Sequence, residues 1–464
     1  MFKLAYKTNH IGEIQQWDAY TKIDHLTYCI EFDNYAFIAR RLMFYVSYYC
    51  NFSRMNFDTS TEQDEFISKV NNACRNLRES EEKAYLEEKL DDKLVPEFAK
   101  IGMLGCPIST KYGGLGYDIL TYILALERIG EESSSMRTFF SAHTSIGQMV
   151  LQSWANEEQK KNHLPRTTDG RSVMAFALTE PEAGSDPSSM VSNYEDKGDH
   201  YILSGKKHWI GNGTIANLIT TYARDKVTGK ISAFIVDMNS PGIHAIEMKH
   251  KLGLLTVKNA EISFHECMIP KENLLAMPGM GLSVAYSALI DGRLSVAAGS
   301  IGVMRDCLTE TVRHSRERKQ HGSLLGKKQL IQHHISKIAV AVESSRWLTY
   351  RAASARQKLH DYVENMKIED IDWQSKLNRK NLDYSILRSE ADRLATIAKL
   401  YATNAAFEAA NRSVQIFGSY AYQKTARVAR HFLDSRATTI YEGANEVIEL
   451  KISANILGKD FRSY

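Results

Sequence analysis

The spacing of apolar residues divides the chain into a helical stretch, a strand-like stretch and a second helical stretch. From about residue 58, Phe66, Val70 and Ala73 recur at helical spacing, and Ser60 with Gln63 forms a candidate capping box at the start of that helix. Further amphipathic helices are predicted at 86–103, 120–129, 141–154 and 157–163. The first part of the chain is therefore expected to be all-helical.

A glycine-rich segment interrupts this helical pattern between residues 105 and 116. It holds four glycines and one proline, which break a helix. A phosphate-binding loop is one interpretation, but no Gly-Lys-Ser/Thr follows the segment and no strand precedes it. We favour a connector whose glycines let the flanking helices approach each other.

At Ser172 the period of the apolar residues changes from helical to strand-like. Short strands are predicted, separated by Gly, Asp and Pro turns, at 173–178, 200–203, 216–222, 232–236 and 262–265. From Leu282 the helical period returns and continues to Leu457. The middle of the chain is thus predicted to be a small all-β domain between two helical ones.

These periods predict three domains after an extension, residues 1–55, to which the sequence assigns no role. The domains are an N-terminal α-helical domain, a middle β domain and a C-terminal helical domain, at 56–170, 171–281 and 282–464. A highly charged run within 359–387 predicts a solvent-facing insertion in the last of them. The order α, β, α is typical of an α+β multidomain chain, and no GxGxxG opens a helix, so a Rossmann dehydrogenase is disfavoured.

Composition narrows the class of protein. With 464 residues, 44% hydrophobic and 24% charged, the chain is expected to be soluble, globular and too long for one core. A net charge of +3 with dispersed basic residues gives no reason to expect nucleic-acid binding. Six scattered cysteines without a CxxC pair predict buried, reduced thiols and no metal site. No apolar run is long enough for a membrane span, and neither a signal-peptide core nor a peroxisomal ending is seen, so a cytoplasmic location is expected.

Glu442 is the residue around which we interpret the chain. It stands between Tyr441 and Gly443 after a β-branched and aromatic run, which predicts a backbone turn in which the glycine supplies the tight conformation. A carboxylate on such a turn can be directed at a substrate. Alone, however, a Glu of this kind is usually a solvated loop residue or a helix N-cap, so its role depends on the motifs elsewhere.

Five motifs, in order, resemble the acyl-CoA dehydrogenase family of flavoproteins over residues 58–458: Ala177-Leu-Thr-Glu-Pro-Glu-Ala-Gly-Ser-Asp186, Lys206-Lys-His-Trp-Ile-Gly-Asn-Gly213, Arg316-Glu-Arg-Lys-Gln-His-Gly322, Val414-Gln-Ile-Phe-Gly418 and Ile440-Tyr-Glu-Gly443. The resemblance implies an N-terminal α-helical domain, a small middle β-barrel domain and a C-terminal four-helix bundle. It also implies FAD-dependent α,β-dehydrogenation of an acyl thioester, in which a Glu abstracts the α-proton and flavin N5 accepts the β-hydride.

Glu442 falls on the family's base position. In some members the base lies instead just before the arginine of the first long C-terminal helix; here that place is Gly292, before Arg293, and holds no carboxylate. An apolar slot beside the thioester would raise the pKa of Glu442 toward the working range. Arg293 is expected either to fix the base loop or to form a structural ion pair. The residues that the resemblance places against the substrate are Ser185, Arg293, Tyr441 and Gly443.

The same resemblance implies the FAD contacts. The residues expected at the isoalloxazine are Phe176, Leu178, Thr179, Gly184, Ser185, Trp209 and Gly211. Arg318 is expected to reach the pyrophosphate across a subunit interface, with Gln329, Gln415 and Gly418 as its neighbours. If sites are shared in this way, the protein is a homodimer or a homotetramer.

Departures from the family pattern leave alternatives open. Gly211 stands where members usually carry a Thr or Ser hydroxyl, and some acyl-CoA oxidases share this feature, so O2 is an alternative to an electron-transfer flavoprotein-like acceptor. Glu449 and Ala454 replace cations on the side of the CoA, and His321 and Gly418-Ser-Tyr-Ala421 also depart from the pattern. An acyl group tethered to an acyl carrier protein is therefore an alternative to acyl-CoA. A non-catalytic scaffold of the same family is the remaining alternative.

Overall fold

The structure is a computed structural model that describes residues 20–23, 26–29, 57–365 and 382–461. The chain divides into two compact units, Met1–Asn56 and Phe57–Tyr464. In the first unit, β1 (Tyr20–Ile23) and β2 (Leu26–Cys29) pair as an antiparallel hairpin. The rest of the extension predicted at 1–55 lies outside the described residues, and the hairpin assigns it no role.

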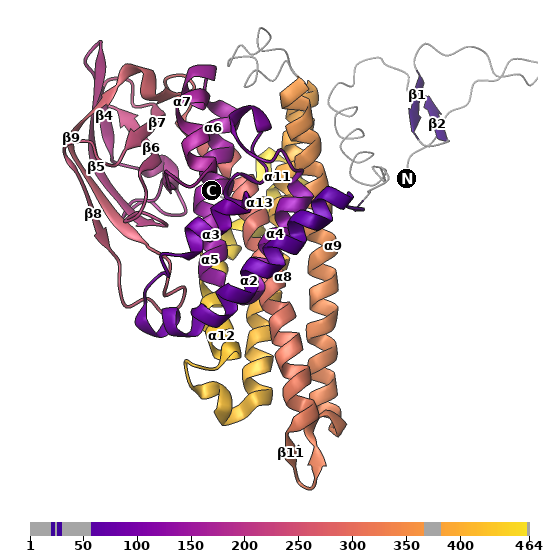
Figure 1. Cartoon of the computed structure of the whole chain (residues 1–464). Coiled ribbons are helices and arrows are strands. Elements are labelled where there is room, and N and C mark those ends of the chain that lie inside the picture. Colours follow the sequence, from indigo (N-terminus) through magenta and orange to yellow (C-terminus); the bar gives the residue numbers. More distant parts are fainter. Residues whose placement is uncertain (1–19, 24–25, 30–56, 366–381, 462–464) are drawn as a thin grey trace, which may run out of the picture. The chain divides into compact units, whose positions relative to one another are not determined.

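The second unit begins with a series of helices (Figure 1). They are α2 (Thr61–Glu87), α3 (Leu94–Lys100), α4 (Ile119–Glu132), α5 (Ser134–Phe140), the π-helix η3 (Ser141–Gln148), α6 (Met149–Trp154) and α7 (Glu157–Thr168). The predicted capping box is confirmed, because the side chains of Ser60 and Gln63 each accept from the other residue's backbone N–H. The predicted helix at 86–103 is wrong at its start: Glu88 is left-handed, with φ of 50°, and ends α2, and the next helix begins at Leu94.

The glycine-rich segment forms two short 3₁₀ turns, η1 (Met103–Gly105) and η2 (Thr110–Tyr112). A Cβ on Gly114 would lie 2.0 Å from the Ile108 carbonyl oxygen, and one on Gly105 would lie 2.8 Å from Cβ of Thr168 in α7. Only glycine fits such close approaches. The structure therefore supports the connector interpretation.

The middle domain is one eight-stranded sheet with the order β10-β7-β6-β4-β5-β9-β8, in which β3 also pairs with β6. The strands are β3 (Met174–Ala177), β4 (Asn193–Asp196), β5 (His200–Ile210), β6 (Leu218–Asp225), β7 (Ile231–Asp237), β8 (Ile243–Glu247), β9 (Ala260–Pro270) and β10 (Leu274–Leu275). In the described residues no ladder joins β8 to β10, so hydrogen bonds do not close the expected barrel. Both end strands are short, and the middle of β8 is exposed, which limits pairing at these edges.

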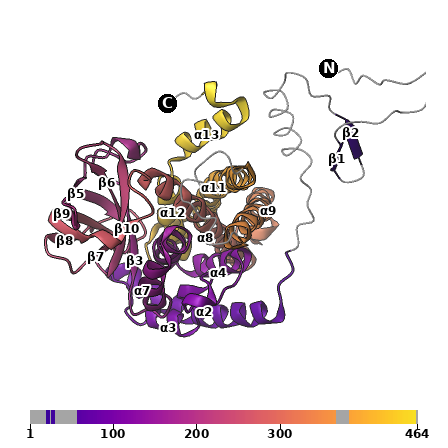
Figure 2. The ribbon, with the colours of Figure 1, turned by 90° about the horizontal axis from the view of Figure 1, so that it is seen from above.

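Long helices form the C-terminal domain, and Figures 1 and 2 show α8, α9 and α11 side by side with the sheet next to the helices. They are α8 (Gly281–Glu317), α9 (Gln329–Asn365) and α11 (Leu382–Phe417), followed by α12 (Arg427–Thr438) and α13 (Asn445–Leu457). A hairpin of β11 (Lys319–Gln320) and β12 (Ser323–Leu324) joins α8 to α9. None of the helices in the described parts of the chain combines the length and apolar character that a membrane crossing needs.

The charged stretch 359–387 is only partly an insertion. Leu359 on α9 is 7% exposed and Tyr384 on α11 is 8% exposed, so both ends of the stretch are packed helix, and the predicted solvent-facing character is wrong there. Charged residues on the outer face of these amphipathic helices masked the apolar positions on the inner face. Residues 366–381 lie outside the described residues.

One large apolar core joins the N-terminal helices to α8, α11 and the strand β3, while a second core lies within the sheet. Cys74, Cys106, Cys267 and Cys307 are buried free thiols, as predicted. Because the first core is continuous across all three predicted domains, residues from each of them are held in fixed positions around the start of α8.

Candidate active site

Glu442 lies on the loop between α12 and α13. Its φ is 56°, and that of Gly443 is 95°. The predicted turn is confirmed, but both residues are left-handed, whereas the sequence indicated only the glycine. A left-handed non-glycine residue costs roughly 1–2 kcal/mol, and such strain is concentrated at functional sites.

The carboxylate of Glu442 lies against Gly292 of α8. A Cβ on Gly292 would be 2.4 Å from Glu442 Oε2 and 2.6 Å from Cδ, so the glycine leaves the space that the carboxylate occupies. Glu442 Oε2 is buried and has no hydrogen-bond partner among the described residues. The two base positions of the family, 292 and 442, therefore converge on one point in space.

Burial raises the pKa of Glu442 to about 7, even though Arg293, Lys399 and Arg137 act in the opposite direction. Removing a carboxylate from water disfavours its charged form, and these cations offset the effect only in part. Near neutral pH a substantial fraction of Glu442 is therefore ionised and able to accept a proton.

Arg293 holds the loop that carries Glu442. Its Nε donates to the Glu442 backbone oxygen (3.2 Å), and its Nη1 donates to Asp392 Oδ1 (2.8 Å) and Thr396 Oγ1 (3.2 Å). Both roles expected of Arg293 are thus present in one side chain: it fixes the loop and forms an ion pair. The ion pair is made with Asp392 on α11.

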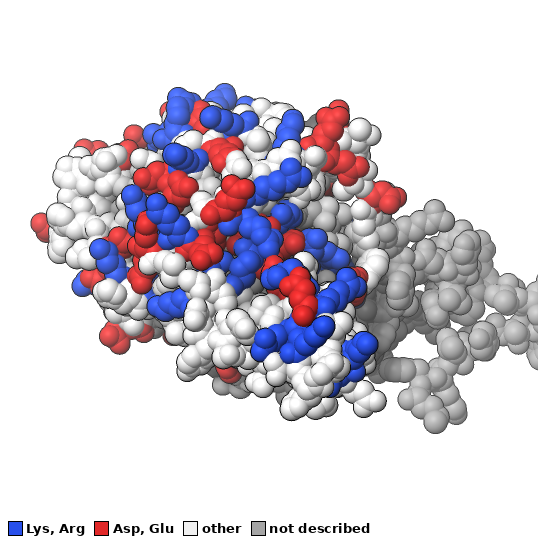
Figure 3. Space-filling model, turned by 60° about the horizontal axis from the view of Figure 1, so that its bottom comes forward, with Lys and Arg blue, Asp and Glu red and all other residues white. Residues whose placement is uncertain are grey.

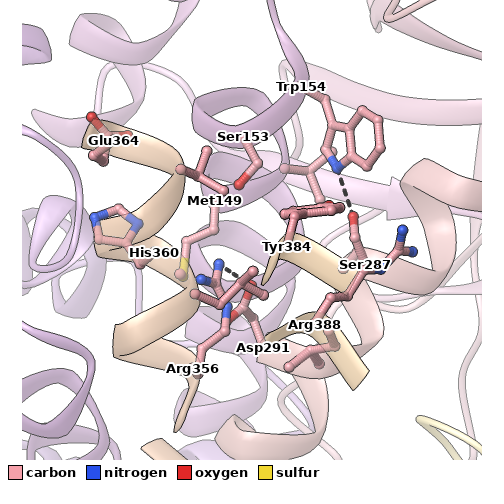
Figure 4. A pocket seen from close by; sticks show the side chains of 15 residues that line it. Met149, Ser153, Trp154, Ser287, Asp291, Arg356, His360, Glu364, Tyr384 and Arg388 are labelled. Carbon is pink, nitrogen blue, oxygen red and sulfur yellow. Dashed lines mark hydrogen bonds and ion pairs between the residues drawn. The ribbon is translucent and has the colours of Figure 1, made fainter. Parts of the chain in front are cut away.

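Asp291, the other buried carboxylate next to Gly292, faces a separate pocket (Figure 4). Arg356 of α9 donates to both of its oxygens, at 2.7 and 3.0 Å. The pocket is open to solvent, and His360, Arg388 and Trp154 also line it. Burial raises the pKa of Asp291 although Arg356 acts in the opposite direction, but the guanidinium occupies both carboxylate oxygens, so we do not expect Asp291 to compete with Glu442 as a base.

Lys399 of α11 is a further residue at this site, which the sequence did not indicate. Its Nζ donates to the Gly443 backbone oxygen (2.7 Å) and to Asn445 Oδ1 (2.7 Å), and burial lowers its pKa to about 7 while Glu442 raises it. With Thr396 and Thr403 it forms a polar stripe at helical spacing in an alanine-rich helix. This stripe of polar residues was the feature of the sequence that could have indicated Lys399.

We expect Lys399→Met to lower kcat about 10-fold or more and to lower stability by about 1–3 kcal/mol, because the Gly443 backbone oxygen and Asn445 Oδ1 both lose the Lys399 donor and the loop loosens. Steady-state kinetics and thermal unfolding check this. Lys424→Met, at an exposed position, is the matched control and should change neither quantity measurably. Unchanged kcat in Lys399→Met would remove Lys399 from the positioning of the loop.

On the sheet, the predicted flavin residues gather near the end of β3 and on β5. Phe176 and Leu178 are buried, whereas Gly184 and Ser185 are exposed on a turn. The Thr179 backbone oxygen accepts from the His208 backbone N–H (2.8 Å), which ties this turn to β5. A buried ion pair between Lys207 and Glu180 (2.7 Å) fixes the same turn from the inside.

Trp209 is 54% exposed, with φ of 60°, at a register shift of β5 between Lys207 and Ile210. A bulge of this kind turns a side chain out of the sheet. A Cβ on Gly211 would meet only Ala142, at 3.6 Å, and one on Gly184 would meet nothing within 4 Å. An exposed flat aromatic at Trp209 and the open space at Gly184 and Gly211 fit an isoalloxazine ring system.

The segment from Arg137 to Ala142 connects this surface to the loop that carries Glu442. Asn212 Nδ2 donates to the Phe139 backbone oxygen (3.1 Å) on one side. On the other side, Arg137 Nη2 donates to Tyr441 Oη (2.5 Å). The structure thus brings the Trp209–Asn212 motif and the Tyr441–Gly443 motif to the same short helical segment, which the sequence did not indicate.

The remaining predicted FAD residues lie at the far end of the helices. Arg318 caps α8 with its guanidinium 5.3 Å from the Tyr420 ring, Gln329 begins α9, and Gln415 and Gly418 are exposed at the end of α11. Arg318 is 25 residues after Arg293, roughly 37 Å along α8. One chain therefore does not bring Arg318 and Glu442 to the same site.

Comparison with known proteins supports this organisation. Models of the acyl-CoA dehydrogenase N-terminal, middle and C-terminal domains match residues 60–171, 175–267, and 279–368 with 381–457. An acyl-CoA dehydrogenase of Bacillus subtilis is 34% identical over 381 residues, covering 81% of this chain and 93% of the relative. The subunit CarC of the caffeyl-CoA reductase–Etf complex of Acetobacterium woodii is 33% identical over 407 residues, covering 85% of this chain and 100% of the relative.

Solved structures agree. Butyryl-CoA dehydrogenase of Megasphaera elsdenii has a TM-score of 0.78 and 30% identity, covering 87% of this chain and 100% of the other. The prolyl acyl carrier protein oxidase AnaB has a TM-score of 0.76 and 28% identity, covering 86% and 100%. Since the matches extend over the helical, sheet and helical regions that surround Glu442, the chain belongs to the acyl-CoA dehydrogenase family.

Proposed function

We propose that this protein dehydrogenates an acyl thioester between Cα and Cβ, with FAD as its cofactor. The observation that carries the proposal is the Glu442 carboxylate, which is buried, lacks a partner for Oε2 and has a pKa of about 7. Such a group can take a proton from a carbon acid placed against it at neutral pH. The names of the acyl-CoA and butyryl-CoA dehydrogenases among its relatives support the same reaction class.

In this reaction Glu442 takes the proton from Cα, the electron pair of that C–H bond forms the new double bond, and the hydrogen on Cβ leaves with its two electrons. FAD, when bound, supplies the acceptor for that hydrogen and electron pair. Arg293 and Lys399 keep the carboxylate in place by holding the backbone oxygens of Glu442 and Gly443. Trp209, Thr179, Gly184, Ser185 and Gly211 would hold the isoalloxazine, with Phe176 and Leu178 behind them.

Two carriers of the acyl group, coenzyme A and an acyl carrier protein, fit the residues of α13. Glu449 is exposed on α13 and Ala454 is half-buried on the same helix, so neither offers a cation to a phosphate. The likeness to a carrier-protein oxidase supports the second carrier, and the likeness to acyl-CoA dehydrogenases supports the first. Both carriers present the acyl group on phosphopantetheine.

For the electron acceptor we propose an electron-transfer flavoprotein, since a relative is named as a subunit of a complex with Etf. O2 is the second candidate because of Gly211 and the likeness to an oxidase. O2 uptake during turnover separates them: fast uptake without any added carrier identifies an oxidase.

We further propose that each FAD is held by two chains. Arg318, Gln329, Gln415 and Gly418 lie too far along the helices to share a site with Glu442 of their own chain, so they would hold the distal half of a cofactor bound by another copy. Basic and acidic side chains alternate over the face in Figure 3, which turns the bottom of the molecule forward. Sedimentation of the FAD-loaded protein should give a dimer or tetramer, and a monomer that keeps its FAD would refute the sharing.

The test of the function is the visible spectrum of the purified protein under anaerobic conditions. Flavin bands that bleach on addition of a short acyl-CoA or acyl-pantetheine establish the dehydrogenation. Bands that persist with every thioester, on either carrier, contradict it. A colourless protein that does not take up FAD would identify a non-catalytic scaffold.

A further inference from the structure

Lys207 and Glu180 form a buried ion pair within the two segments that would hold the isoalloxazine. Lys207 lies on β5, two residues before Trp209, and Glu180 directly follows Thr179 in the turn after β3. Lys207 Nζ is 2.7 Å from Glu180 Oε1, and the two side chains are 0% and 1% exposed. The proposed reaction has so far given this pair no role beyond fixing the turn.

The positive end of the pair faces the turn after β3. Besides Glu180, Lys207 Nζ donates to the Leu178 backbone oxygen (3.4 Å). Glu180 also accepts from the backbone N–H groups of Val191 (2.7 Å) and Ser192 (3.1 Å), which come later in the chain. The ammonium is therefore held against the backbone of the turn, whereas the carboxylate is held by N–H groups beyond it.

Both members of the pair carry their charge at neutral pH. Burial lowers the pKa of Lys207 to about 8, and the pairing with Glu180 acts in the opposite direction. Burial alone would raise the pKa of Glu180, but Lys207 and the N–H donors hold that pKa below its usual value. The chain thus keeps two opposite charges out of water at this place.

Folding stability by itself does not account for the pair. Removing two charges from water costs about as much as their attraction returns, and well-packed apolar side chains often stabilise an interior equally well. A buried charge has another effect, however. Where water does not screen it, the charge changes the energy of any further charge nearby much more than a surface residue does.

Reduction is the step in which the charge of the cofactor changes. A hydrogen that leaves Cβ with its two electrons brings one negative charge to the flavin, and the proton from Cα goes to Glu442 and does not cancel that charge. A buried ammonium nearby lowers the free energy of the reduced, negatively charged flavin, and a buried carboxylate raises it.

We propose that Lys207 and Glu180 set the reduction potential of the bound flavin, with Lys207 favouring the reduced form and Glu180 opposing it. Neither residue takes part in the transfer of the proton or of the hydride. The inference rests on the proposed placement of the isoalloxazine at Thr179 and Trp209, and it does not depend on which substrate reduces the flavin.

The test measures the reduction potential of the FAD-loaded protein by anaerobic equilibration with a reference dye, each variant against wild type at the same pH. Lys207→Met at pH 7 leaves the carboxylate without its cation, so the ratio of reduced to oxidised flavin at a given potential should fall about 10-fold. For a two-electron couple this equals about 30 mV. Glu180→Gln at pH 6, where the ammonium keeps its proton, should raise the ratio about 10-fold.

The opposite signs distinguish an electrostatic role from a structural one. Loosening of the turn would change both variants in the same direction, so shifts of equal sign, or no shift in either variant, would overturn the inference. The double variant Lys207→Met/Glu180→Gln carries neither charge and should lie between the two single variants. If Lys207→Met does not fold, Glu180→Gln carries the test, because Gln has nearly the shape of Glu; a lower or unchanged potential there would overturn the inference.

Two further variants serve as controls. Lys207→Arg keeps the charge and should stay within about 3-fold of the wild-type ratio. Lys206→Met changes the same residue type one position earlier on β5, where the side chain is 50% exposed and pairs with Glu261 at 2.9 Å. Water screens that charge, so Lys206→Met should change the ratio by less than about 2-fold. A shift in Lys206→Met as large as that in Lys207→Met would overturn the role of the buried pair.

The measurement uses no thioester and therefore separates this inference from the proposed function. Opposite shifts in a protein whose flavin no thioester bleaches would support the inference and contradict the function. Bleaching by a thioester together with unshifted potentials would support the function and overturn the inference. A protein that takes up no FAD would overturn both.

Discussion

Glu442→Gln is expected to keep FAD bound, and the rate at which substrate bleaches its flavin should fall by about 10²- to 10⁴-fold. Gln has nearly the same shape as Glu but cannot accept the α-proton. In the wild-type protein the rate should rise with pH and level off above pH 7, because burial raises the pKa of Glu442 to about 7 and only the ionised form acts. The variant should lose this dependence. Anaerobic stopped-flow absorbance between pH 5 and 9 measures both effects.

Glu449→Gln is the matched control. Glu449 is exposed on α13, so this variant makes the same chemical change outside the loop that carries Glu442. It should bleach at the wild-type rate and keep the wild-type pH profile. Full bleaching by Glu442→Gln would show that Glu442 is not the base and that another group accepts the α-proton. A pH profile that falls as pH rises through 7 would contradict the sign of the assignment.

Gly292→Ala is expected to lower kcat about 100-fold without loss of FAD. The new methyl group would lie 2.4 Å from Glu442 Oε2 and 2.6 Å from Cδ, so the carboxylate must move by about 1 Å. A displacement of this size from a reactive geometry typically costs about 10²-fold in rate. Stopped-flow reduction measures the loss, and the flavin spectrum measures the cofactor content.

The clash in Gly292→Ala is with a side chain and not with the backbone, so the fold should survive. Gly302→Ala supplies the contrast: its Cβ would lie 2.3 Å from the Glu127 backbone oxygen in α4, which cannot move freely. We expect Gly302→Ala to lower the unfolding temperature more than Gly292→Ala does. Gly292→Ala should instead lower the rate of flavin reduction with little effect on the unfolding temperature. A wild-type rate in Gly292→Ala would show that the carboxylate works from another position.

Much of the fold could be predicted because the spacing of apolar residues in a helix or strand depends only on residues close together in the chain. The capping box at Ser60, the helix around 120–129 and the strands after Ser172 follow from residues within one or two turns of each other. The sequence could not locate the break at Glu88, since residues 86–93 hold no glycine or proline. It also missed the edge strand β8, which follows Pro241 and Gly242 but is short and lacks a strict apolar alternation. It also misjudged Leu359 and Tyr384, which are buried by partners distant in sequence.

The sequence by itself determined the α, β, α order, the family resemblance and the choice of Glu442 over Gly292, because these depend on residue identity and local spacing. Tertiary structure alone decided that the Glu442 carboxylate lies against Gly292, that Lys399 holds the loop, and that Arg137 is buried with donors to spare. Each of these depends on residues that are far apart in the chain. Their contacts, their loss of water and the resulting pKa of about 7 arise only when α5, α8, α11 and the loop after α12 pack together.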